Sequence, residues 1–126
     1  MSHKILIVED NEKNLCLLRD ILTYHGYDVA VARDGQEGVA LARELMPELV
    51  LMDIQMPCLD GMAALRTLKA DAATSGLKIV AMTSFVMQGD RDKFMTAGFD
   101  DFLAKPISTR EIPELVKRWL DMEEKA

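Results

Sequence analysis

Four short apolar runs in this 126-residue sequence end in side chains that could take part in chemistry. The side chains at these four ends are Glu9 with Asp10, then Asp53, Thr83 and Lys105. A carboxylate at the end of a buried run is costly unless a cation or a hydrogen-bond donor meets it. If the four ends lie together, three carboxylates, one hydroxyl and one ammonium share a single site.

Such a group of side chains favours a hard divalent cation. Three close carboxylates repel one another, and each raises the pKa of the others unless a positive charge is present. Mg²⁺ prefers oxygen ligands, and we expect Mg²⁺ here, with Mn²⁺ as a possible substitute. A carboxylate that keeps one oxygen free of the ion can attack phosphorus, while the cation, ammonium and hydroxyl stabilise the transferred group. The residue types therefore indicate formation of an aspartyl phosphate.

The elements that must position these side chains alternate along the chain. Apolar, β-branched runs predict five strands, at Lys4–Val8, Tyr27–Ala32, Leu49–Met52, Lys78–Thr83 and Asp101–Lys105. Helical spacing of apolar residues predicts a helix after each strand, with these residues on the helices: Leu15, Leu18, Ile21, Leu22; Val39, Ala42, Leu45; Met62, Leu65, Leu68; Phe94, Met95; and Ile112, Leu115, Val116, Trp119, Leu120. For the last helix we expect a capping box of Ser108 and Glu111, with Pro113 beyond the first turn.

This (βα)5 order predicts an α/β fold with a parallel sheet and helices on both faces. Right-handed crossovers favour the doubly wound, flavodoxin-like three-layer sandwich with strand order 2-1-3-4-5. In a parallel sheet the carboxyl ends of all strands meet at one edge, so the polar side chains named above are expected to converge there. Ligands of open α/β sheets also bind at this edge.

Composition limits the function classes further. We expect one domain over residues 1–126, with no output domain after it. The formal net charge is −6 and the pI is about 4.9, which disfavours nucleic acid and anionic membranes as partners. No run reaches transmembrane length and the start does not resemble a signal peptide. Cys16 and Cys58 lack metal-binding spacing, so we expect free thiols and a cytoplasmic location.

In this order and on these strands, Glu9-Asp10, Asp53, Thr83 and Lys105-Pro106 resemble the receiver domain of two-component response regulators, a CheY-like family. The resemblance extends from Lys4 to about Leu120. Four strings resemble in particular the stand-alone, single-domain receivers that regulate cell division: Ile5–Asn11, Leu51–Pro57, Gly89–Arg91 and Ala104–Ser108.

The resemblance implies a role for each site residue. Asp53 would accept a phosphoryl group from the phosphohistidine of a histidine kinase or of a histidine phosphotransfer protein. Mg²⁺ would be held by the Asp10 and Asp53 side chains and the Gln55 carbonyl, with Glu9 acting through water. Thr83 would donate a hydrogen bond to the phosphoryl group and Lys105 would pair with it. The chain would be no enzyme beyond self-phosphorylation and slow autodephosphorylation.

The resemblance also implies where the signal leaves the domain. Phe102 stands at the switch aromatic position, where Tyr is frequent in the family; without the hydroxyl, the switch would work through ring packing. Phe85 and Met87 follow Thr83 in an apolar loop and would move with it. A downstream protein would then bind to the surface of the fourth helix, fifth strand and fifth helix. The domain is expected to be a monomer.

Two alternatives to a stand-alone receiver stay open. One is the receiver part, or the phosphotransfer intermediate, of a hybrid-kinase relay. Another is a Mg²⁺-dependent phosphatase with an aspartate nucleophile, although Gln55 stands where such enzymes have a second acid. A flavodoxin-like FMN carrier is disfavoured because no Ser/Thr/Gly-rich loop follows the first strand. The plain structural interpretations are a helix cap for Asp53, a strand end for Thr83 and a solvated lysine for Lys105.

Overall fold

The computed structural model describes residues 3–54, 61–83, 90–105 and 108–124 of the chain. Strands and helices alternate as the sequence predicts, and each strand is followed by a helix. In chain order these elements are β1 (Lys4–Val8), α1 (Glu12–Tyr24), β2 (Asp28–Ala32), α2 (Gly35–Leu45), β3 (Leu49–Asp53), α3 (Gly61–Ala70), β4 (Lys78–Thr83), α4 (Asp90–Ala97), β5 (Asp101–Ala104) and α5 (Ile112–Glu124).

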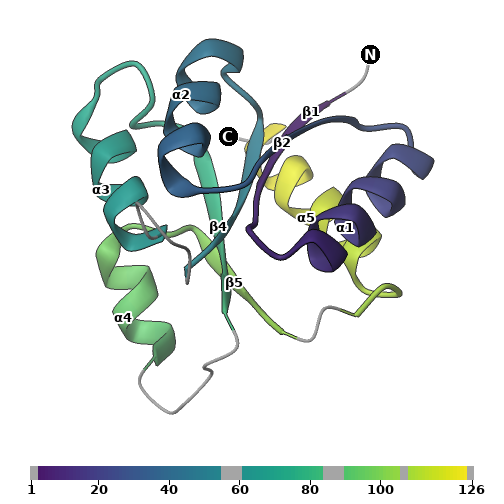
Figure 1. The fold of residues 1–126 in the computed structure, drawn as a ribbon. Coiled ribbons are helices and arrows are strands. Elements are labelled where there is room, and N and C mark those ends of the chain that lie inside the picture. The colour runs from purple at the N-terminus through teal and green to yellow at the C-terminus, as the bar shows by residue number, and fades with distance from the viewer. Residues whose placement is uncertain (1–2, 55–60, 84–89, 106–107, 125–126) are drawn as a thin grey trace.

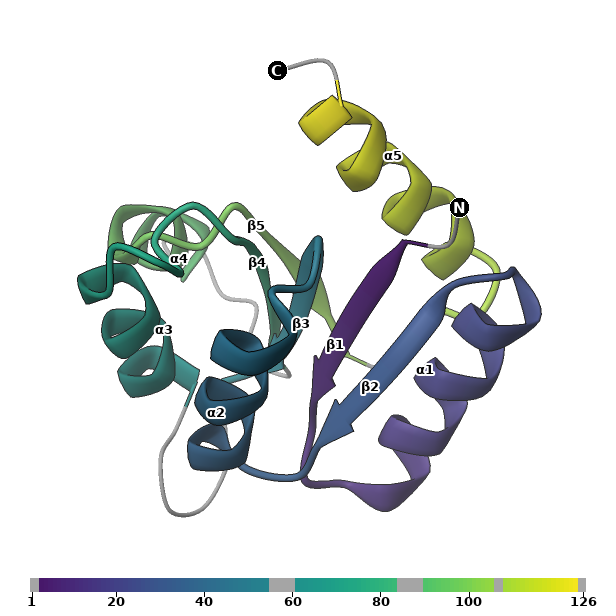
Figure 2. The same cartoon turned by 90° about the horizontal axis from the view of Figure 1, so that it is seen from above.

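The strands form one parallel sheet with the order β2-β1-β3-β4-β5. Helices α1 and α5 cover one face of the sheet, and α2, α3 and α4 cover the other (Figures 1 and 2). The predicted doubly wound, three-layer α/β fold and its strand order are therefore confirmed. Among the described residues, no helix is long and apolar enough to cross a bilayer.

Each face of the sheet packs into its own apolar core, and the strands supply the two cores alternately. On β1, Leu6 and Val8 belong to the core under α2 and α3, whereas Ile5 and Ile7 belong to the core under α1 and α5. Successive side chains of a strand point to opposite faces. Since both faces are covered, every residue of β3 is buried, which is why its first four residues, Leu49–Met52, form a continuous apolar run.

Local sequence signals set both ends of α1 and the start of α2. The side chain of Asn11 caps α1 by accepting from the Asn14 amide at 3.1 Å, and Asp34 caps α2 by accepting from the Glu37 amide at 2.8 Å. The chain leaves α1 through Gly26, whose φ of 90° suits a residue without a side chain.

The predicted capping box at the last helix is wrong. The Ser108 backbone carbonyl accepts from the amides of Glu111 and Ile112, and α5 begins only at Ile112. Pro113 therefore lies in the first turn, where its missing N–H removes no helical hydrogen bond. Three strand ends also differ by one residue from the prediction, since β2 begins at Asp28, β3 ends at Asp53 and β5 ends at Ala104.

Candidate functional site

Backbone hydrogen bonds continue past the strand ends and hold the predicted site residues at the carboxyl edge of the sheet. The Glu9 amide donates to the Ala32 carbonyl at 3.0 Å, which extends the pairing of β1 with β2. The Lys105 amide donates to the Thr83 carbonyl at 2.8 Å, which extends the pairing of β5 with β4. Glu9 and Lys105 therefore have the fixed backbone of a strand although neither lies within one.

The alternation of the strands explains which side chains meet. Glu9, Asp53 and Lys105 each come two residues after an apolar residue of the core under α1 and α5; those three residues are Ile7, Leu51 and Leu103. With a side-chain period of two, all three polar side chains are directed to the same face of the sheet. Three strands thus contribute one side chain each to a single cluster.

One ammonium serves two buried carboxylates in this cluster. Lys105 Nζ lies 2.8 Å from Glu9 Oε2 and 3.1 Å from Asp53 Oδ2. The Glu9 residue is 0% exposed and Asp53 is 3% exposed, whereas the Lys105 side chain is 13% exposed. Two formal negative charges and one positive charge are thus held where water has little access. Such a cluster is costly unless a proton or a second cation joins it.

The pKa of Glu9 reports this imbalance. The pKa of Glu9 is raised from its ordinary value of 4.5 to about 7, mainly by burial and also by the nearby Asp53 carboxylate, while Lys105 and the Asn11 amide act in the opposite direction. That amide donates to Glu9 Oε1 at 3.1 Å. Buried Oε2 has the ion pair with Lys105 but no hydrogen bond among the described residues. Glu9 thus has an oxygen that a further cation or donor would stabilise.

Lys105 is held in its charged form. Burial alone lowers the pKa of its ammonium, but the close ion pairs with Glu9 and Asp53 outweigh that effect, so the pKa is raised above the ordinary 10.5. A permanent positive charge beside Asp53 is suited to attract an anionic group to this carboxylate.

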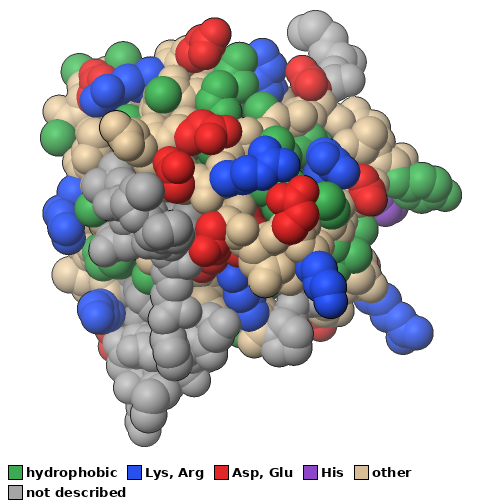
Figure 3. Space-filling model, in the orientation of Figure 1, with side chains coloured by type: hydrophobic (Ala, Val, Ile, Leu, Met, Phe, Trp, Pro, Cys, Tyr) green, Lys and Arg blue, Asp and Glu red, His purple; other side chains and the backbone are tan. Residues whose placement is uncertain are grey.

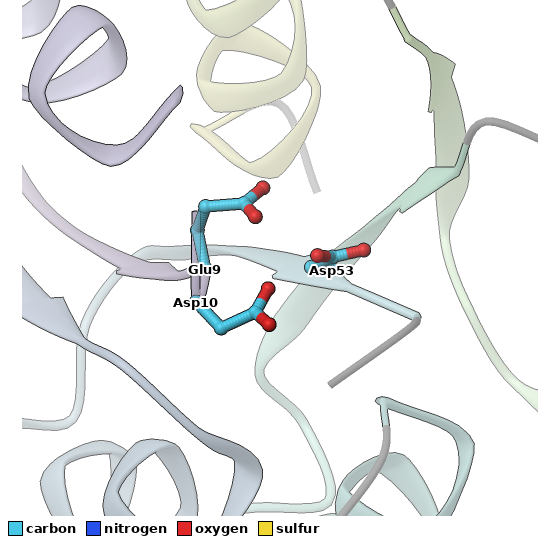
Figure 4. A group of neighbouring side chains, drawn as sticks. All are labelled: Glu9, Asp10 and Asp53. Carbon is cyan, nitrogen blue, oxygen red and sulfur yellow. The ribbon is translucent and has the colours of Figure 1, made fainter. Parts of the chain in front are cut away.

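Asp10 completes a set of oxygen ligands for a metal ion. Glu9, Asp10 and Asp53 each offer one carboxylate oxygen, and these three oxygens lie within 4.8 Å of one another. Figure 4 shows the Glu9 and Asp10 side chains extending from the end of β1 toward the side on which Asp53 lies. Asp10 is exposed, so the set opens to solvent on its side. All-oxygen ligands, excess negative charge and an open side fit a hard cation such as Mg²⁺.

Of the other predicted residues, Thr83 and Phe102 belong to the opposite face of the sheet from the Glu9–Asp53–Lys105 cluster. Thr83 is 1% exposed at the end of β4, but it follows Ala81 in the alternation, so its side chain is directed to the face under α2–α4. Phe102 pairs with Ala81 in register and packs, half-buried, against the same core. Gln55, Phe85 and Met87 lie outside the described residues.

One glycine beside the cluster is not marked by the sequence pattern. Gly61 begins α3, and its Cα lies directly against the backbone of Asp53 and Ile54. In the sequence, Gly61 is marked only as a turn residue that follows Asp60. Its special position is visible only in the three-dimensional contact with the Asp53 backbone.

The fold and the site together define a class of protein. Residues 5–117 match the response regulator receiver domain, and the chain belongs to this family of two-component signalling domains. It is 38% identical over 120 residues to the polar-differentiation response regulator DivK of Brucella ovis; the match covers 95% of this chain and 98% of that protein. The predicted resemblance to stand-alone receivers of this kind is therefore confirmed.

Solved structures give the same result. The receiver domain of the sensor histidine kinase PA1611 from Pseudomonas aeruginosa is 35% identical, with a TM-score of 0.87 over 96% of this chain and 99% of that one, and holds a magnesium ion in its active-site cleft. A CheY-like receiver domain protein from Methanospirillum hungatei is 30% identical, with a TM-score of 0.89 over 99% and 98% of the two chains. The CheY-like fold is thus established for this chain.

Proposed function

We propose that this chain is a DivK-like response regulator that accepts a phosphoryl group on Asp53 and signals through phosphorylation-dependent protein binding. The observation that carries the proposal is the buried Asp53 carboxylate, 3.1 Å from the Lys105 ammonium and within reach of two further carboxylates. The phosphoryl donor is the phosphohistidine of a histidine kinase or of a histidine phosphotransfer protein. Membership of the receiver-domain family implies a histidine kinase as a partner.

In the proposed transfer, one Asp53 oxygen attacks phosphorus, the P–N bond to the donor histidine breaks, and the histidine leaves with the bond's electron pair. Asp10 and Asp53 would hold Mg²⁺, together with the Gln55 carbonyl and with Glu9 through water, and the ion would neutralise charge on the transferred group. Lys105 is already beside Asp53 and needs no large movement to pair with a phosphoryl oxygen. Burial strengthens that pairing because water screens it poorly.

The proposed signal leaves through β4 and β5. A hydrogen bond from the Thr83 hydroxyl to the phosphoryl group would draw the end of β4 toward Asp53; such a bond is worth about 1.5–3 kcal/mol. Thr83 and Phe102 share the face under α2–α4, which supports the proposal that a shift of Thr83 would change the packing of the Phe102 ring. We propose that a downstream protein binds the α4–β5–α5 surface. Phe102→Ala should then keep Asp53 labelling while it weakens phosphorylation-dependent binding.

A second reading is the receiver of a hybrid kinase, which the similarity to the PA1611 receiver supports. Both readings use the same site and differ in the partner. Phosphotransfer from a panel of histidine kinases and phosphotransfer proteins would separate them.

Monomeric state and cytoplasmic location stay predictions from the sequence. The net charge of −6 still disfavours nucleic acid, and acidic and basic side chains intermingle on the face in Figure 3.

The direct test is transfer of labelled phosphate from a kinase to wild type and to Asp53→Asn. We expect wild type to carry an acid-labile phosphate and Asp53→Asn to carry none. Asp10→Asn should lose labelling and Mg²⁺ binding together, as should wild type in excess EDTA. Asp28→Asn is a matched control, because Asp28 is exposed at the start of β2, on the opposite edge of the sheet. Labelling of Asp53→Asn at the wild-type level would contradict the proposal.

A further inference from the structure

Gly61 is the first residue of α3 and lies directly against the backbone at the end of β3, which carries Asp53. Its amide donates to the Ile54 carbonyl at 3.0 Å, and the residue is buried. A Cβ at this position would overlap the Asp53 carbonyl oxygen and would lie 2.7 Å from the Ile54 Cα. Both are backbone atoms, so no change of rotamer could relieve the overlap. The start of α3 can lie this close only because residue 61 has no side chain.

The opposite side of the same backbone is held by β4. Asp53 pairs with Met82 in the sheet, and the Ile54 amide donates to the Met82 carbonyl at 3.0 Å. The backbone of Asp53 and Ile54 therefore lies between β4 and Gly61. A side chain at position 61 would have to displace α3 or push this backbone against the hydrogen bonds of the sheet.

A shift of the Asp53 backbone would be felt at its carboxylate. That carboxylate is buried, and its Oδ2 is fixed 3.1 Å from Lys105 Nζ. A misplacement of about 1 Å in a reacting group can cost roughly 100-fold in rate. The geometry therefore connects the absence of a side chain at position 61 with the reactivity of Asp53.

We propose that Gly61 is a positioning residue for phosphorylation, which keeps the Asp53 carboxylate in line with Lys105 and the metal ligands. This inference rests on the proposed role of Asp53 as phosphoacceptor. Gly61 itself touches no reacting atom and acts through the backbone of Asp53.

Two other glycines provide matched controls. At Gly38 in α2, a Cβ would lie 2.8 Å and 2.9 Å from the two methyl groups of Val8, so Gly38→Ala also crowds the interior but meets a side chain. At Gly76 a Cβ would have no neighbour within 4 Å. Gly38→Ala therefore reports the effect of crowding a helix against the sheet, and Gly76→Ala reports the effect of the substitution alone.

The experiment measures urea unfolding, Mg²⁺ affinity and the rate of Asp53 phosphorylation by acetyl phosphate at saturating Mg²⁺ for wild type and the three variants. We expect Gly61→Ala to lower the maximal rate about 100-fold and to weaken Mg²⁺ binding. Gly38→Ala should lose stability yet keep its rate within about twofold, and Gly76→Ala should match wild type. A folded Gly61→Ala protein with the rate and Mg²⁺ affinity of Gly38→Ala would overturn the proposal.

Two further measurements cover the remaining outcomes. If Gly61→Ala is unfolded in buffer, all proteins are compared in an osmolyte that favours the folded state. If Gly61→Ala stays unfolded in the osmolyte, the hydrogen-exchange rate of the Gly61 amide is measured in wild type before and after phosphorylation. Phosphorylation should change this rate at least tenfold, and an unchanged rate would overturn the positioning role of Gly61. If wild type itself takes no phosphate on Asp53, the proposed function has failed, and the role of Gly61 is decided separately. Equal Mg²⁺ affinities of wild type and Gly61→Ala would then overturn that role. If Gly61→Ala is unfolded, unchanged exchange protection of the Gly61 amide in Asp53→Asn would overturn it.

Discussion

The two edges of the sheet hold their carboxylates in different ways. At the amino edge, Asp100 accepts from the Ile79 amide at 2.7 Å, and Asp101 accepts from the Trp119 indole at 2.8 Å and from the Phe102 amide at 2.8 Å. Each of these acids has its own neutral donors, and each keeps some contact with water. At the carboxyl edge, Glu9 and Asp53 are almost fully buried and share one ammonium.

The difference separates acids that are satisfied by neutral donors from acids whose negative charge is only partly neutralised. An acid that only links elements is satisfied by donors already present, as Asp101 links β5 to α5 through Trp119. At the carboxyl edge, the carboxylates of Glu9, Asp10 and Asp53 instead carry more negative charge than Lys105 neutralises, and this excess favours a metal ion. The cost of that arrangement should appear as instability and as dependence on pH and Mg²⁺, whereas the amino edge should show neither dependence.

The largest effect on stability is expected for Lys105→Met. Glu9 and Asp53 would lose the Lys105 ammonium that both contact, and breaking a buried ion pair costs about 3–5 kcal/mol. We expect a loss near the lower figure in urea unfolding at pH 8 with EDTA, and a smaller loss with Mg²⁺ present. Lys117→Met is the control, because it removes the same charge from an exposed position of α5. Equal stability of the two variants would show that the negative charge of Glu9 and Asp53 does not destabilise the folded protein.

The next effect is a pH dependence that Glu9 alone should cause. In the metal-free folded protein the pKa of Glu9 is about 7, against 4.5 when it is exposed in the unfolded chain. The folded state therefore binds this proton more tightly, and stability present below pH 4.5 is lost as the pH rises to 7. The loss amounts to about 3 kcal/mol at most.

Glu9→Gln has no such proton, so its stability should lack this fall and should exceed that of wild type at pH 8 in EDTA. Urea unfolding between pH 4.5 and 8 measures the difference between the two proteins. Glu48→Gln serves as the control at the amino edge, since Glu48 is 44% exposed and pairs with His3. If the stabilities of wild type and Glu9→Gln changed in parallel between pH 4.5 and 8, the assignment of the pH dependence to Glu9 would be refuted.

The smallest effect is expected at the amino edge, for Trp119→Phe. The variant loses one hydrogen bond to a carboxylate and part of a buried ring, which together should cost about 2 kcal/mol. The cost should be the same at pH 6 and pH 8, and with or without Mg²⁺, because no metal ligand is involved. Asp101→Asn keeps an acceptor for the indole and should lose less. A Trp119→Phe loss that varied with Mg²⁺ would mean that the two edges are coupled.

The sequence was sufficient for the order of elements and for most of the site. Apolar runs of four to six residues, separated by helical patterns, determine the (βα)5 alternation because each pattern reflects its own local period. Glu9, Asp53 and Lys105 stand out because a charged residue that ends an apolar run is unusual. Local signals failed at α5, where Ser108 and Glu111 match a capping box but the chain enters the helix one turn later.

Tertiary structure decided what adjacent residues do. Glu9 and Asp10 are neighbours in sequence, yet one is fully buried beside Lys105 and the other faces solvent, because the pairing with β2 continues through Glu9 and sets its direction. The sharing of one ammonium by two carboxylates depends on side chains from three strands and appears in no local pattern. The same holds for Gly61, whose importance lies in a contact with the Asp53 backbone that forms only when α3 packs against the sheet. Local propensity acts over a few residues, whereas burial, charge imbalance and close approach depend on the whole fold.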